Sequence, residues 1–243
     1  MTEIIYQELR DRFQEQCRQH DLMDRDVEIK ARALTTAEAI GDPEADDFPL
    51  QQGKERLMQA DFMGAVGQAF SDRYGDYQGT LRNILNMSLT NNYRRALFVA
   101  TINAVTRYLE QTGQTIHCHD QEPEACAGEL AEYIRQTYGE ARITQIGFQP
   151  TMVERLAADF SYRILDLDPD NIGQHKRGAL VEGPEALQEA IDQADLLLVT
   201  GTTLVNGTIG SFLVPGKPVI FYGTTIAGAA ALMGWQRFCA KGK

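Results

Sequence analysis

Short apolar runs recur along the second half of the chain, each followed by a turn and a helical pattern. Every run is continuous and flanked by turn-forming residues. Such runs are typical of parallel strands that are covered on both faces. The pattern predicts an α/β fold whose C-terminal part is a Rossmann-like parallel sheet of four strand–helix units. The predicted strands are Arg142–Gly147, Tyr162–Leu167, Asp195–Thr200 and Pro218–Tyr222, and the predicted helices are Pro150–Asp159, Pro184–Gln193, Thr203–Leu213 and Thr225–Met233.

The first half combines helical spacing with strict alternation of apolar and polar positions. Alternation at period two predicts a half-buried antiparallel strand, and glycines in a second strand would allow close backbone approach. Apolar positions at helical spacing predict one long buried helix. An amphipathic helix is predicted before it, and a helix whose acidic first turn matches the helix dipole is predicted after it. This half is therefore predicted to be α+β. The strands are Val27–Leu34 and Phe62–Phe70, and the helices are Tyr6–Arg18, Asn92–Gln111 and Glu122–Tyr138.

Charge divides the chain at the same place as the pattern. Residues 1–140 hold 14 basic and 24 acidic side chains, whereas residues 141–243 hold 9 and 10. We predict two domains, 1–140 and 141–243, with the boundary at this change. The net charge of −11 argues against binding to a nucleic-acid backbone, which needs a basic face.

Compartment and membrane association follow from composition. The four cysteines show no paired spacing, which favours a reducing compartment, and the first residues lack the features of a secretory signal. Residues Pro218–Trp235 carry no charge, but three glycines and a threonine pair interrupt them. We predict a cytoplasmic protein without membrane partners.

The loops after the first two predicted strands carry polar residues that allow more than one role. Gly147 is the only glycine of a dinucleotide fingerprint that is present, so ordinary NAD binding is not expected, and Gln149 begins a helix whose N–H groups could hold a small anion. Asp166 and Asp168 stand where related folds place a ribose-binding carboxylate. They could instead hold a cation through oxygen ligands, or both loops could be ordinary turns.

Hydroxyl and amide side chains are concentrated after the third and fourth strands. Their chemistry suits hydrogen bonding to a polar ligand better than metal ligation, although one of them is enough to cap a helix. Two neighbouring loops of the same chemistry favour a shared polar pocket. The residues are Thr200, Gly201, Thr202, Thr203 and Asn206 in the first loop, and Tyr222 and Thr224 in the second.

The first half offers two further groups. Asn91 and Asn92 precede the long helix, where capping explains only one of them. His117, Cys118 and His119 gather imidazole and thiol ligands, without the usual spacing of a structural zinc site. These three are the predicted metal ligands, with a solvated loop and a buried thiol as the alternative. No Ser/His/Asp arrangement is recognisable, and catalytic residues are not identified.

Several of these motifs together resemble the putative heavy-metal chelation family. The resemblance implies a Rossmann-like domain packed on a partner that is similar to the N-terminal domain of enolase, with a site in the cleft between them. The segments that carry it are Gly147–Pro150, Leu165–Gly173, Val199–Thr208 and Phe221–Gly223, with Leu89–Asn92 and the helix around Asn103 for the partner.

The resulting hypothesis is a protein that binds a small molecule or metal complex in the interdomain cleft. A transition metal ion is the candidate cofactor, and a homo-oligomer is allowed. An enzyme that uses S-adenosylmethionine or a nucleotide, and a non-catalytic interaction protein, remain as alternatives, so enzymatic activity is undetermined. The predicted ligand-binding residues are Asn91, Asn92, Gly147, Gln149, Asp166, Asp168, Thr200, Gly201, Thr202, Thr203, Asn206, Tyr222 and Thr224.

Overall fold

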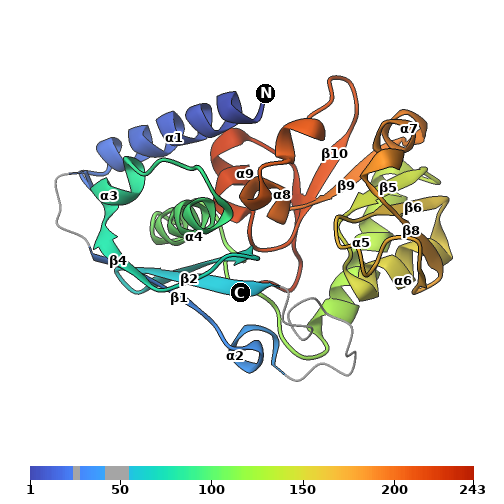
Figure 1. Ribbon diagram of the computed structural model, residues 1–243, viewed down its shortest axis with the longest axis horizontal. Helices are drawn as coiled ribbons and strands as arrows, with labels where there is room; N and C mark the ends of the chain where they lie inside the picture. Colours follow the sequence, from blue (N-terminus) through green and yellow to red (C-terminus); the bar gives the residue numbers. More distant parts are fainter. Residues whose placement is uncertain (24–27, 42–54) are drawn as a thin grey trace.

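The computed structural model describes residues 1–23, 28–41 and 55–243, with the side chains of residues 28–31 left aside. It is a mixed α/β structure with two sheets, one formed by the earlier part of the chain and one by the later part (Figure 1). Helix α4 lies between the first sheet and the helices that follow the strands of the second (Figure 1). No helix among the described residues is both long and apolar enough to span a bilayer.

The first sheet has four antiparallel strands in the order β3-β2-β1-β4. The predicted strand Val27–Leu34 is confirmed as β1, but the single strand predicted over Phe62–Phe70 is wrong. A two-residue turn at Met63 and Gly64, both with positive φ, divides it into a hairpin. The strands are β1 Glu28–Ala33, β2 Arg56–Phe62, β3 Ala65–Ser71 and β4 Tyr77–Thr80.

Helix α4 is the centre of the molecule. All residues from 96 to 106 are buried, and most of them are apolar, as expected of a helix that is enclosed on every side. Gly67 of β3 permits this packing, because a Cβ there would lie 2.2 Å from the backbone nitrogen of Ala104. The helices of this part are α1 Thr2–Gln19, α2 Thr36–Ile40, α3 Leu81–Leu85 and α4 Asn92–Tyr108.

The second sheet has seven strands in the order β11-β10-β9-β5-β6-β8-β7, and only β7 pairs antiparallel. The four predicted strands are confirmed as its central members, and the short strands β7, β8 and β11 were not predicted. The bounds are β5 Ile143–Ile146, β6 Tyr162–Leu165, β7 His175–Lys176, β8 Ala179–Glu182, β9 Leu196–Thr200, β10 Val219–Tyr222 and β11 Arg237–Phe238.

Helices cover the second sheet as predicted, with one change. The helix predicted over Thr203–Leu213 is interrupted at Gly207, whose left-handed conformation (φ +86°) ends α8 before a short 3-10 turn. The elements are α5 Glu122–Tyr138, α6 Pro150–Asp159, η1 Pro184–Ala186, α7 Leu187–Gln193, α8 Thr202–Asn206, η2 Ile209–Ser211 and α9 Ala227–Met233.

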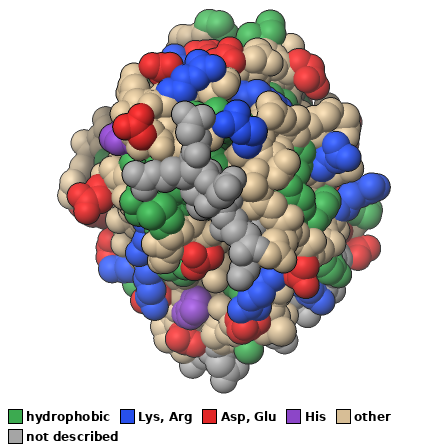
Figure 2. Space-filling model, turned by 90° about the vertical axis from the view of Figure 1, so that its left-hand side faces the viewer, with side chains coloured by type: hydrophobic (Ala, Val, Ile, Leu, Met, Phe, Trp, Pro, Cys, Tyr) green, Lys and Arg blue, Asp and Glu red, His purple; other side chains and the backbone are tan. Residues whose placement is uncertain are grey.

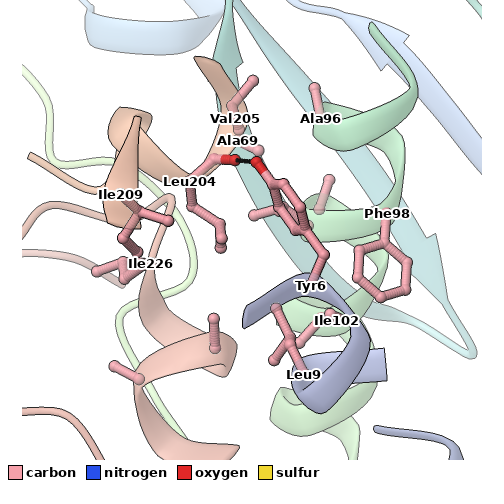
Figure 3. Packing of buried hydrophobic residues seen from close by; sticks show 14 of the residues in the cluster. Tyr6, Leu9, Ala69, Ala96, Phe98, Ile102, Leu204, Val205, Ile209 and Ile226 are labelled. Carbon is pink, nitrogen blue, oxygen red and sulfur yellow. Dashed lines mark hydrogen bonds between the residues drawn. The ribbon is translucent and has the colours of Figure 1, made fainter. Parts of the chain in front are cut away.

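The largest hydrophobic cluster joins the two parts of the chain. Leu9 of α1 and Phe98 of α4 belong to the same cluster as Leu204 of α8 and Ile226 before α9 (Figure 3). The Tyr6 hydroxyl donates a hydrogen bond to the Leu204 carbonyl inside it (Figure 3). Helix α5, although it precedes residue 141, packs on α6 and on strands of the second sheet. The division into domains 1–140 and 141–243 therefore stays a prediction.

Candidate functional site

A cavity of about 620 Å³ lies between elements of the two sheets. It meets the ends of β5, β6, β9 and β10, the edge at which parallel sheets place their ligands. From the earlier part of the chain it receives the end of β3, the start of α4 and the segment at residues 117–118. The predicted residues that line it are Asn92, Gly147, Gln149, Asp166, Asp168, Thr200, Gly201, Thr202, Thr203, Asn206, Tyr222 and Thr224.

Asn91 is the one predicted ligand-binding residue that is absent from this lining. Its Oδ1 accepts a hydrogen bond of 3.0 Å from the Arg94 N–H and so caps α4. Asn92 lines the cavity and donates to Asp72 Oδ1 at 2.6 Å. The guanidinium of Arg95 bonds both Asn92 Oδ1 and, at 2.6 Å, the Val205 carbonyl. Arg95 thereby ties the start of α4 to the loop after β9.

The ends of β5 and β6 are joined by the carboxylate of Asp166. One of its oxygens accepts the Phe148 N–H and the other the Asp168 N–H, each at 2.6 Å. Because both oxygens already hold backbone groups, the carboxylate acts first as a brace for the two loops. Gly147 has φ +93°, and a Cβ at this position would lie 2.6 Å from Thr200 Cγ2. A glycine is therefore required where these loops meet the cavity.

Gln149 also has a structural role in its own loop, since its Oε1 accepts the Met152 N–H at 2.5 Å and caps α6. The same loop is held from β10 by Tyr222, whose hydroxyl donates to the Gly147 carbonyl at 2.7 Å. Burial raises the pKa of this phenol far above its usual range, and the charge of Asp166 adds to the effect. Tyr222 therefore stays neutral and serves as a hydrogen-bond donor.

Most hydroxyls after β9 bond within their own loop. Thr200 and Thr202 share a hydrogen bond of 3.1 Å between their hydroxyl oxygens, and the Thr203 hydroxyl donates to the Thr200 carbonyl at 2.7 Å. Asn206 Oδ1 accepts from the hydroxyl of Thr208 at 2.7 Å. These bonds give the cavity wall a fixed shape before any ligand enters.

The loop after β10 is anchored to the earlier part of the chain by Asn103. This buried amide of α4 donates to the carbonyls of Gln68, Thr224 and Thr225, and its Oδ1 accepts the Gly228 N–H at 2.7 Å. Asn103 thus positions Thr224 at the cavity.

The predicted metal ligands do not meet at one point. His117 and Cys118 line the cavity, whereas His119 does not. Burial lowers the pKa of His117 to about 4, and the pKa of the Cys118 thiol is raised to about 12 by burial and by the thiols of Cys126 and Cys239. In the parts of the chain that the structure describes, no group of three or more His, Cys, Asp or Glu side chains is arranged to hold a metal ion. The metal site at 117–119 stays a prediction.

Sequence reasoning missed several residues at this cavity. Cys126 and Cys239 join Cys118 in its lining, and Glu55 and Asp72 join Asp166 and Asp168. Burial and the charges of the three aspartates raise the pKa of Glu55 to about 7. Glu55 sits just before β2 and Cys239 just after the two-residue strand β11, so neither follows a strand end that the pattern could have indicated.

The later part of the chain is similar to a known protein family. Residues 129–232 match the model of the family described as putative heavy-metal chelation. This part of the chain, less than half of its length, is similar to that family. The predicted resemblance is thereby confirmed for it, while the likeness of the earlier part to the enolase N-terminal domain stays a prediction. A comparison with curated proteins found no significant match.

Two solved structures of members of this family, both described as of unknown function, are similar to the chain. The first, from Pyrococcus horikoshii, has a TM-score of 0.55 and 18% identity, over 89% of this chain and 79% of the other. The second, from Desulfitobacterium hafniense DCB-2, has a TM-score of 0.49 and 13% identity, over 73% and 72%. The likeness to the first supports the mixed α/β fold and extends beyond residues 129–232.

Proposed function

We propose that this protein binds a metal, a metal complex or a small polar molecule in the cavity between its two sheets. The observation that carries the proposal is that the loops after four parallel strands and the start of α4 all contribute to one cavity. Its volume of about 620 Å³ falls within the range of small-molecule sites, about 300–1,000 Å³. The family description, putative heavy-metal chelation, supports a metal-containing ligand.

The chemistry of the lining favours binding over catalysis. Asp166, Gln149 and Asn206 are engaged in hydrogen bonds that shape their loops, and Tyr222 is held neutral. Such a wall has a fixed shape and presents hydrogen-bonding groups, which suits recognition of a polar ligand. The S-adenosylmethionine or nucleotide enzyme is less well supported, because both oxygens of Asp166 are already bonded to backbone N–H groups.

Native mass spectrometry and elemental analysis of protein purified without chelators test this proposal. We expect a bound species or metal that is lost on denaturation. Two neighbouring variants make a matched pair. Asn92→Ala removes a side chain from the cavity and should lower occupancy at least fivefold, whereas Asn91→Ala removes only the cap of α4 and should leave occupancy within twofold. Equal occupancy in both variants, or no bound species together with no binding of added Zn²⁺, Ni²⁺, Co²⁺ or cationic complexes, would overturn the proposal.

A further inference from the structure

Three cysteines line the cavity together, although they come from separate parts of the chain. Cys118 lies before α5, Cys126 within α5, and Cys239 just after β11. Each thiol is near enough to the other two for their charges to interact. Cys17, by contrast, is fully buried in α1 and does not line the cavity. All four cysteines are free thiols, and the fold brings three of them to one site.

Cys126 lies against the turn that carries Cys239. Its sulfur accepts hydrogen bonds from the backbone N–H groups of Ala240 and Lys241, the two residues that follow Cys239. Burial raises the pKa of the Cys126 thiol, and these two N–H groups act against that rise because they stabilise the thiolate. The turn itself is tight, since a Cβ on Gly242 would lie 2.9 Å from the Cys239 sulfur. The two sulfurs therefore share one turn of the chain.

Arg237 supplies a positive charge beside the same two sulfurs. Its guanidinium donates a hydrogen bond to the Cys239 sulfur, and its charge also acts on Cys126. Burial lowers the pKa of Arg237, while the two cysteines act in the opposite direction. The guanidinium is fixed by hydrogen bonds to the carbonyls of Gly223 at 3.0 Å and Gln114 at 2.7 Å. Since arginine stays charged in proteins, it can offset negative charge on the sulfurs.

These surroundings suit a pair of thiolates better than a pair of thiols. A neutral thiol is only a weak hydrogen-bond acceptor, so it gains little from backbone donors and a guanidinium. Sulfur ligands of a metal are thiolates, and hydrogen bonds from outside the metal's own ligand shell orient and tune them. Thiolates are soft ligands that select soft metals such as Cu⁺. The donor set at Cys126 and Cys239 therefore fits the soft members of the heavy metals.

The number of converging ligands points to the same metals. Among the described residues, no three His, Cys, Asp or Glu side chains are arranged to hold an ion. Zn²⁺ takes a tetrahedral set with at least three protein ligands, so this wall does not offer a zinc site. Cu⁺, Ag⁺ and Hg²⁺ accept two thiolates in a linear arrangement, because their filled d shells favour low coordination numbers. Two sulfurs are then sufficient.

We infer that Cys126 and Cys239 bind one soft metal ion as a pair of thiolates at the wall of the cavity, with Arg237 and the N–H groups of the following turn offsetting their charge. Binding forms two metal–sulfur bonds and releases one proton from each thiol, and it needs no oxidant or reductant. The complex carries one negative charge with Cu⁺ or Ag⁺ and none with Hg²⁺. The inference rests on the proposed function and names both the class of metal and its donors.

Titration of the full chain with Ag⁺ and Hg²⁺ in chloride-free buffer tests the inference. Excess glutathione is present, because it removes ions from single thiols more readily than from a pair that chelates. We expect native mass spectrometry to find one ion per chain, bound at least tenfold more tightly than Zn²⁺ or Ni²⁺ under the same conditions. X-ray absorption spectroscopy of the Hg²⁺ form should show two sulfur ligands.

Variants assign the two sulfurs. Cys126→Ala and Cys239→Ala should each weaken Hg²⁺ binding at least tenfold, whereas Cys118→Ala should change it less than threefold. Cys17→Ala is the matched control, because it removes a buried thiol outside the cavity and should change affinity less than twofold. Circular dichroism identifies any variant that fails to fold. The X-ray absorption spectrum of the original chain depends on no variant and decides in that case.

Several outcomes would overturn the inference. These are a spectrum with fewer than two sulfur ligands, Zn²⁺ binding as tight as Hg²⁺ binding, and equal weakening by Cys17→Ala or Cys118→Ala. A disulfide between Cys126 and Cys239 that forms in place of metal binding would also overturn it. If a bound species that depends on Asn92 is then still found, the proposed function stands and the ligand is held elsewhere in the cavity.

Discussion

Glu55 lies immediately before β2 and lines the cavity, and its ionisation is linked to folding. Burial and the charges of Asp166, Asp72 and Asp168 raise its pKa from 4.5 to about 7. In the unfolded chain the carboxyl loses its proton near the ordinary value. Between about pH 4.5 and 7 the folded protein therefore retains a proton that the unfolded chain has released, and stability falls as the pH rises through this window.

Glu55→Gln should abolish this loss. The free energy of unfolding of the variant, relative to that of the original chain, should rise between pH 5 and pH 8 by up to about 3 kcal/mol, since one pKa unit corresponds to about 1.4 kcal/mol. Urea denaturation at several pH values measures the difference. Parallel stability curves for the two proteins would show that Glu55 ionises normally.

Helix α4 packs closely against β3 of the first sheet. A Cβ on Gly67 would lie 2.2 Å from the Ala104 nitrogen and 2.4 Å from the Ala100 carbonyl oxygen, both backbone atoms that cannot move independently of the helix. Gly67→Ala should therefore separate strand and helix and destabilise the protein by about 2–4 kcal/mol, within the usual range for overpacked or strained core sites. The loss should appear as a lower midpoint in urea denaturation.

Gly128 of α5 provides the matched control. A Cβ there meets nothing within 4 Å, and alanine is the better helix former. Gly128→Ala should therefore be neutral or raise stability by up to about 1 kcal/mol. If Gly67→Ala had the same small effect, close approach would not be the reason for a glycine in β3.

The elements that the sequence predicted well are those that pattern alone can define. The central strands β5, β6, β9 and β10 are continuous apolar runs between turn formers, and α5 and α6 have clear starts and stops, so their bounds are close to the predicted ones. Strands β7 and β11 contain two residues each, too few to show any period, and owe their pairing to neighbours distant in sequence.

The hairpin at Met63 and Gly64 was read as one strand for a related reason. Its two strands are joined by a turn of only two residues, and the apolar residues on either side hide the reversal. The candidate site shows the same division. Residues that follow predicted strands were found because parallel strands end at one edge, whereas Glu55, Asp72 and Cys239 reach the cavity through tertiary packing that no local pattern reveals.

At the scale of the whole molecule, neither sign of charge dominates the one face shown in Figure 2. On the face shown in Figure 2, acidic and basic side chains of the described residues are interspersed.

The two sheets should unfold as one unit, because hydrophobic residues of both contribute to one cluster and because Asn103 bonds to both sides. Trp235 is the only tryptophan, and its ring packs 5.2 Å from that of Phe221 in β10, so its fluorescence reports on the second sheet. Far-ultraviolet circular dichroism reports on the whole chain. Thermal or urea transitions followed by the two methods should coincide.

Asn103→Ala examines that linkage directly. The variant removes four buried hydrogen bonds, which leaves the Gly228 N–H and three carbonyls without this partner. Unsatisfied buried groups of this kind cost about 1–3 kcal/mol each at most, and relaxation reduces their sum, so we expect a loss of about 3–4 kcal/mol. Because the shared hydrophobic cluster is unchanged, the fluorescence and dichroism transitions should move together to a lower midpoint.

Transitions that separate in the variant would mean that Asn103, rather than the hydrophobic cluster, makes the two sheets one cooperative unit. Separation already in the original chain would contradict the single unit itself and with it the fixed cavity on which binding depends.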